Sequence, residues 1–124
     1  DLLLARMDVR LIIQVLVNLV DNAIKYTPSG STITIRALKK NEKAWISVED
    51  NGPGISDEIK PHIFEMFFTG GNNIADSQRS LGLGLALCQS IVEAHGGKME
   101  LEDNDPHGCI FSFALPLSEV ILNE

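Results

Sequence analysis

The stretch from Gln14 to Tyr26, QVLVNLVDNAIKY, constrains the fold most, because two patterns share it. Asn18, Asn22 and Tyr26 follow one another at steps of four, so they lie along one stripe of a helix, with Lys25 beside it. Apolar residues at helical spacing predict that the other side is buried, through Val15, Leu16, Leu19, Val20, Ala23 and Ile24. This pattern predicts a ligand-facing helix, although by itself it also fits an ordinary surface helix.

The rest of the chain predicts strands and helices in a defined order. We expect an edge strand at 2–4, a helix from its N-cap Asp8 to Tyr26, and a hairpin of strands 32–38 and 44–49 around the turn 39–43. Further on we expect a short helix from Ser56 or Asp57 to Phe64, a loop at 68–80, a helix at 81–95, and a closing hairpin of strands 98–102 and 109–117. This order predicts an α+β fold, a two-layer sandwich with helices on one face of a mixed, mostly antiparallel sheet.

The length and composition predict one domain, spanning residues 1–124. A net charge of −7 argues against general nucleic-acid binding. We expect the two cysteines, Cys88 and Cys109, to be buried reduced thiols. No apolar run is long enough for a membrane span, and the chain begins at Asp1, so we expect a cytoplasmic piece of a longer protein, whose other parts can include a membrane anchor.

Three sets of residues carry candidate nucleotide chemistry. Asp50 ends a predicted strand before a glycine-rich turn, where its carboxylate can accept a hydrogen bond from an amino group such as that of adenine, and Gly52 and Gly54 allow a flat ring to approach. A plain turn explains the same residues. The segment Gly82–Leu85 opens a helix whose N–H groups can hold phosphate oxygens. Asn22 can offer a neutral oxygen to Mg²⁺.

Four segments in this order resemble the N, G1, F and G2 boxes of the histidine-kinase ATP-binding domain: NLVDNAIKYTP, VEDNGPGI, IFEMFF and LGLGLALCQSIVEAHGG. The resemblance covers about residues 7–116 and extends to the superfamily of gyrase, Hsp90 and MutL, whose Bergerat-type sandwich binds ATP under a flexible lid. The opening MDVRLIIQVL, with the apolar Leu81 before the glycines, resembles the potassium-responsive KdpD-type sensor kinases.

The resemblance implies a role for each matching residue. Asn18, Asn22 and Lys25 would be the catalytic residues, with Asn22 the Mg²⁺ ligand, and residues 68–80 would form the ATP lid. The remaining contacts to ATP would come from Tyr26, Asp50, Gly52, Gly54, Ile55, Phe68, Leu81, Gly82, Leu83, Gly84 and Leu85. Two departures, Ser80-Leu81 before the glycines and Gly108-Cys109 for the common Gly-Thr, leave the fine phosphate geometry open.

The resemblance implies a domain that binds ATP·Mg²⁺ and delivers the γ-phosphate to a histidine on a separate dimerisation domain, with a response regulator downstream. None of His62, His95 and His107 lies in a phosphoacceptor motif, so we interpret all three as structural. An ATP-gated clamp is the first alternative, but Asn18 stands where clamp ATPases carry a general-base Glu. A nucleotide-independent interaction module is the second, with Phe64, Phe67 and Phe68 as an exposed docking patch.

Overall fold

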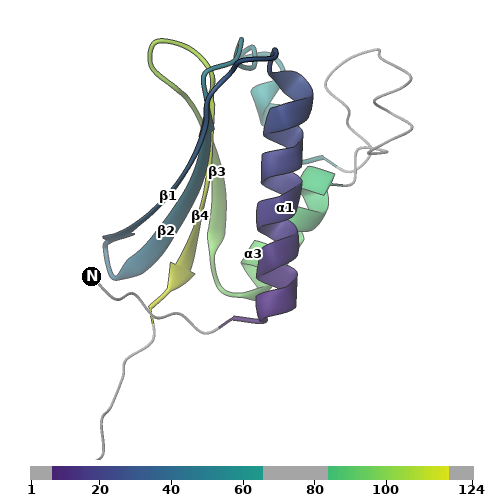
Figure 1. Cartoon of the computed structure of the whole chain (residues 1–124). Coiled ribbons are helices and arrows are strands. Elements are labelled where there is room, and N and C mark those ends of the chain that lie inside the picture. The colour runs from purple at the N-terminus through teal and green to yellow at the C-terminus, as the bar shows by residue number, and fades with distance from the viewer. Residues whose placement is uncertain (1–6, 66–83, 118–124) are drawn as a thin grey trace, which may run out of the picture.

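The computed structural model describes residues 7–65 and 84–117, and these form a two-layer sandwich. Helices α1 (Val9–Tyr26) and α3 (Gly84–Ala94) lie on one face of a four-stranded sheet (Figure 1). The strands are β1 (Ile33–Lys40), β2 (Lys43–Asp50), β3 (Lys98–Asp103) and β4 (Cys109–Pro116), and a 3-10 turn, η1 (Lys60–His62), follows β2. The predicted α+β sandwich is confirmed. The predicted strand at 2–4, the loop at 68–80 and the first residues of the second helix lie outside the described residues.

The sheet order is β1-β2-β4-β3, and each of its three pairings is antiparallel. The two predicted hairpins are therefore present, and they join through β2 and β4. Strands β2 and β3 run in the same direction but do not pair, because β4 lies between them and runs the opposite way. The expectation of a mixed sheet is not met among the described strands, which contain no parallel pair.

Helix α1 begins where the sequence predicts, because Asp8 caps it. The Asp8 carboxylate accepts hydrogen bonds from the backbone N–H of Arg10, at 3.1 Å, and of Leu11. The helix buries a stripe at spacings of three and four: Ile12, Val15, Leu19 and Ala23. The prediction that Ile24 joins this buried face is wrong, since its side chain is 59% exposed. Ile24 is one position, or about 100°, past Ala23, which turns it away from the sheet.

Helix α3 ends at the predicted glycine pair. Gly96 has a φ of 78°, its N–H donates to Glu93 O, and the N–H of Gly97 donates to Val92 O, both at 2.9 Å. This is a Schellman ending, in which a left-handed glycine lets the last carbonyls of the helix find donors. Just before it, the His95 ring links the two helices: Nδ1 donates to Ile91 O at 2.8 Å, and Nε2 accepts the Asp8 N–H at 2.9 Å. The structural interpretation of His95 therefore agrees with its contacts.

Two local predictions need correction. The turn between β1 and β2 is shorter than 39–43, because pairing continues to Lys40 and Lys43 and leaves only Asn41 and Glu42 between the strands, with φ of 54° and 62°. Both residues adopt the left-handed backbone conformation, as in the two-residue turns whose twist matches that of the paired strands. The predicted helix up to Phe64 forms only turns and η1. Pro61 lacks an N–H and opposes an α-helical turn before it.

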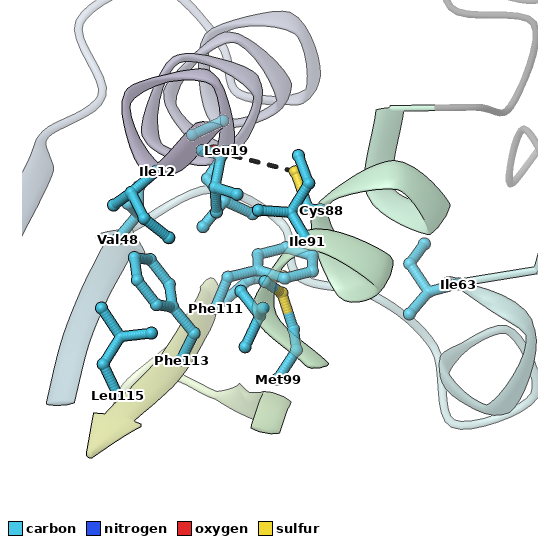
Figure 2. Packing of buried hydrophobic residues seen from close by; sticks show 14 residues of the cluster. Ile12, Leu19, Val48, Ile63, Cys88, Ile91, Met99, Phe111, Phe113 and Leu115 are labelled. Carbon is cyan, nitrogen blue, oxygen red and sulfur yellow. Dashed lines mark hydrogen bonds between the residues drawn. The ribbon is translucent and has the colours of Figure 1, made fainter. Parts of the chain in front are cut away.

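The core lies between the helices and the sheet. Figure 2 shows side chains of α1 and α3 pointing at those of β2, β3 and β4, with Phe113 and Leu115 fully buried. Phe64 packs against this core, and its ring meets that of Phe111 edge-on, with centroids 6.1 Å apart. The expectation that Phe64 belongs to an exposed patch is therefore wrong, because its ring faces inward, while Phe67 and Phe68 lie outside the described residues.

Both cysteines are buried free thiols, as predicted. The Cys88 thiol donates to Val15 O on α1 at 3.7 Å (Figure 2). Burial raises the pKa of Cys88 to about 11, although a hydrogen bond with Asn18 acts against the shift. Burial likewise raises the pKa of Cys109 to about 11, and the negative charge of Asp50 contributes to that shift. In the folded domain these thiols are neutral and poor nucleophiles.

The raised thiol pKa values predict a loss of stability in alkaline solution. An unfolded thiol ionises near its usual pKa of 9.0, below the folded value of about 11. The contribution of the two neutral thiols to the free energy of unfolding is therefore fully present below pH 9.0. It is lost as the pH rises toward 11, because in that range thiols ionise in the unfolded chain but stay neutral in the folded one. Urea unfolding at about pH 8 and about pH 10.5 measures this fall. The Cys88→Ala/Cys109→Ala double variant should lose less stability than wild type, and an equal loss would contradict the prediction.

No helix in the described part of the chain is long and apolar enough to cross a membrane.

Candidate functional site

The last residue of β2, Asp50, is the candidate base-reading residue. Its side chain lies at the end of the strand and is only 7% exposed. One carboxylate oxygen, Oδ1, accepts the N–H of Gly52 at 2.9 Å and that of Cys109 at 3.2 Å. Within residues 7–65 and 84–117 no donor reaches the other oxygen, Oδ2. The protein thus fixes the carboxylate with backbone donors and leaves one acceptor for an external amino group.

The two glycines of the loop after β2 have different structural roles. A Cβ on Gly52 would lie 2.6 Å from Cγ2 of Thr27, at the end of α1. Gly54 has a φ of 83°, and a Cβ there would lie 3.5 Å from Gly108 O. The absence of a side chain at Gly52 therefore lets the loop pack against the end of α1, whereas at Gly54, where a Cβ would make an ordinary contact, glycine suits the left-handed backbone. The approach of a flat ring to these glycines stays a prediction.

Helix α1 carries the second group of candidate residues. Asn18 lies near the buried Cys88 thiol of α3 and acts against the rise of its pKa. One turn later, Asn22 is half-buried. Lys25 lies 5.5 Å from the centre of the Tyr26 ring, and Tyr26 is 42% exposed. The helix therefore places Asn18 near α3 and its cation and aromatic ring at its C-terminal end.

Thr27 joins this helix to the Asp50 loop. Its hydroxyl donates to Ala23 O at 2.7 Å and ends the helix, while its methyl group packs on Gly52. Figure 1 shows the end of α1, the end of β2 and the β3–β4 turn at the same end of the molecule. The structure thus brings the helix that carries Asn22 and Lys25 against the loop that follows Asp50.

The other predicted contact residues divide into two groups. Gly84 begins α3, while Leu85 and Ile55 are partly buried and pack against the core. These two side chains contribute to packing, and their contact with a nucleotide stays a prediction. The remaining four lie outside the described residues: Phe68, Leu81, Gly82 and Leu83.

Sequence reasoning missed a supporting layer around Asp50. Asn104 donates from Nδ2 to the main-chain oxygen of Asp50 at 2.8 Å, and His107 Nδ1 donates to Gly52 O at 2.9 Å. Both belong to the β3–β4 turn, which the sequence indicates only as a polar turn. The spacing gives no sign of these contacts, because Asn104 lies 54 positions after Asp50.

Comparison with known proteins identifies the family of the chain. Residues 7–119 match the family model described as histidine kinase-, DNA gyrase B-, and HSP90-like ATPase. The chain is 50% identical over 116 residues to the sensor protein KdpD of Clostridium acetobutylicum, covering 94% of this chain and 13% of that protein. The resemblance to KdpD-type kinases is thus confirmed, and the chain spans about an eighth of that relative.

Solved structures give the same result. The catalytic domain of the histidine kinase ThkA has a TM-score of 0.77 and 38% identity, with coverage of 90% of this chain and 70% of that one. ThkA in complex with the response regulator protein TrrA matches with a TM-score of 0.68 and 39% identity, over 86% of this chain and 28% of that one. With a matching family model and fold, the chain belongs to the histidine kinase-, DNA gyrase B- and HSP90-like ATPase family, as an ATP-binding catalytic domain of the sensor histidine kinase type.

Proposed function

We propose that this domain binds ATP together with Mg²⁺ and presents the γ-phosphate to a histidine on a separate dimerisation domain of a longer protein. The observation that carries the proposal is the fixed carboxylate of Asp50, which keeps one acceptor oxygen at the end of the molecule where α1 ends. A buried carboxylate held by two backbone donors is a prepared acceptor for the exocyclic amine of adenine.

The remaining roles follow the two elements that meet at this site. Gly52, Gly54 and Ile55 form the base side with Asp50. From α1, Tyr26 contacts the nucleoside, and its partly exposed ring suits that contact. We assign the phosphate contacts to Lys25, Asn18 and Asn22, and further contacts to ATP to Phe68, Leu81, Gly82, Leu83, Gly84 and Leu85.

The residues present suit a Mg²⁺ ion that binds mainly through phosphate oxygens and water. Asn22 is half-buried, and its carboxamide has no hydrogen bond to any residue in 7–65 or 84–117. Its oxygen is therefore available as a single neutral ligand, which is sufficient for an ion that keeps several waters. When bound, the ion supplies charge neutralisation at the phosphates.

Asn18 argues for phosphoryl transfer to a partner and against ATP hydrolysis by this domain. A carboxamide cannot take a proton from water, and Asn18 is directed at the Cys88 thiol. Catalysis then consists of positioning the triphosphate, with Lys25 offsetting its charge, while the nucleophile comes from another domain. The acceptor histidine is not in the described residues, since His62, His95 and His107 each bond to nearby protein groups.

The partners of the longer protein belong to the same proposal. Its phosphorylated histidine would pass the phosphoryl group to a response regulator, consistent with the complex of ThkA and TrrA among the similar structures. The proposal also places this domain in the cytoplasm, as part of a parent protein held at the inner membrane.

Replacing Asn22 with Ala should remove the contribution of Mg²⁺ to nucleotide binding. We expect Mg²⁺ to tighten the binding of a non-hydrolysable ATP analogue to wild type. With Mg²⁺ present, Asn22→Ala should bind the analogue about tenfold more weakly than wild type, the scale of one lost interaction with a charged group. Calorimetric titration with and without Mg²⁺ measures both. Gln14→Ala, an exposed polar change on the same helix, is the control and should bind as wild type does. No binding by wild type would overturn the proposed function.

A further inference from the structure

The β3–β4 turn holds Asp50 through Asn104. Both polar atoms of the Asn104 side chain form hydrogen bonds: Nδ2 donates to Asp50 O at 2.8 Å, and Oδ1 accepts the N–H of Asp105 at 2.9 Å. Its own backbone N–H donates to Gly108 O at 3.0 Å and closes the turn. The carboxamide therefore has one orientation that satisfies all its partners, and in that orientation its donor points at the Asp50 peptide.

The residues just before β4 restrain the same group. Gly108 has a φ of 114°, and a Cβ there would lie 2.0 Å from Asp50 O, so only glycine allows this approach. The next residue, Cys109, donates its N–H to Oδ1 of Asp50. One short segment thus contacts Asp50 at its main-chain oxygen and at one side-chain oxygen, which leaves Oδ2 as its remaining acceptor.

This arrangement makes the direction of Oδ2 depend on Asn104. Fixing the Asp50 carbonyl orients the peptide plane that joins Asp50 to Asn51, and the chain continues from there to Gly52, whose N–H is the other donor to Oδ1. Without the Asn104 donor that carbonyl loses its side-chain partner, and the loop can relax toward water. A hydrogen bond to a ligand weakens steeply when donor and acceptor are misaligned, so a small rotation of the carboxylate is enough to lose selectivity.

We propose that Asn104 is a positioning residue for nucleobase selection, which aims Oδ2 of Asp50 at the exocyclic amine of adenine. This inference rests on the proposed function and adds to it the residue that sets the preference for a 6-amino purine. Asn104 itself contacts no nucleotide in this assignment, because both ends of its carboxamide are already bonded within the protein.

The test compares two nucleotides that differ only in that amine. Wild type and Asn104→Ala are titrated with ATP and with the triphosphate of purine riboside, in which hydrogen replaces the amino group. We expect Asn104→Ala to lose about tenfold in affinity for ATP and less than about twofold for the analogue, because only ATP donates to Asp50. The preference for ATP should therefore fall by at least about fivefold. If the role of Asn104 were purely structural, Asn104→Ala would weaken the binding of both nucleotides equally.

Two further variants make the result specific. Asn104→Asp has the same shape and keeps the acceptor for Asp105, but it has no donor for Asp50 O, so it should lose the preference as Asn104→Ala does. Glu102→Ala, an exposed change on the same hairpin, should keep it. Circular dichroism checks that each variant is folded, and Asn104→Asp replaces Asn104→Ala in the comparison if the latter unfolds.

The outcomes separate the two proposals. If wild type binds ATP no better than the analogue, Asp50 does not read the amine, and both the base-reading role and this inference fail. If wild type prefers ATP and both Asn104 variants keep that preference, or lose affinity equally for both nucleotides, the inference about Asn104 is overturned and the proposed function stands.

Discussion

Asp50→Asn should weaken ATP binding by about 1–3 kcal/mol, or roughly 5-fold to 150-fold, the usual cost of a lost hydrogen bond to a charged group. The substitution keeps the shape of the side chain. Its oxygen can still accept from the N–H groups of Gly52 and Cys109, which are the two donors to Oδ1 in wild type. The new amide nitrogen then takes the place of Oδ2, so that a donor faces the adenine amine. Calorimetric titration with a non-hydrolysable ATP analogue measures the change.

Two controls distinguish this effect from general damage to the loop. Glu102→Gln removes one negative charge from the exposed side of the same hairpin and should leave ATP affinity within about twofold, as surface changes usually do. The urea midpoint of Asp50→Asn should stay close to that of wild type, because the internal hydrogen bonds are kept. Unchanged ATP affinity in a folded Asp50→Asn variant would remove Asp50 from the base-reading role.

Phe113→Ala should lower the free energy of unfolding by about 3–5 kcal/mol. Phe113 is 0% exposed in the middle of β4, where its ring is enclosed between the sheet and the two helices (Figure 2). Truncation removes a buried ring and leaves a cavity, and the rigid neighbours can fill it only in part. A domain of this size has about 5–15 kcal/mol of stability in total, so the variant should unfold at much lower urea.

Equilibrium urea unfolding, followed by circular dichroism, measures this loss. Leu38→Ala is the comparison, because its side chain on the edge strand β1 is 46% exposed and its truncation should cost less than about 1 kcal/mol. Similar losses in the two variants would mean that the layer between sheet and helices is not the main source of stability.

Much of the fold follows from short-range patterns in the sequence. The helix from the Asp8 cap to Tyr26, both hairpins and the end of α3 at Gly96 are where the sequence predicts them. Capping, alternation and glycine signals act over a few residues, so they can be read without knowing the fold. One error came where a nearby residue overrode the pattern, as Pro61 did for the predicted helix before Phe64.

The sequence by itself determined the elements, the family and the candidate residues on α1 and at Asp50. Only the tertiary structure decided which faces are covered, that Phe64 turns inward and Ile24 outward, and that β4 lies between β2 and β3. It also decided how Asp50 is held, through partners 54 and 59 positions away, Asn104 and Cys109. The physical reason is that periodicity records which side of an element is apolar, whereas a hydrogen bond between distant segments depends on how the elements pack, which no local spacing encodes.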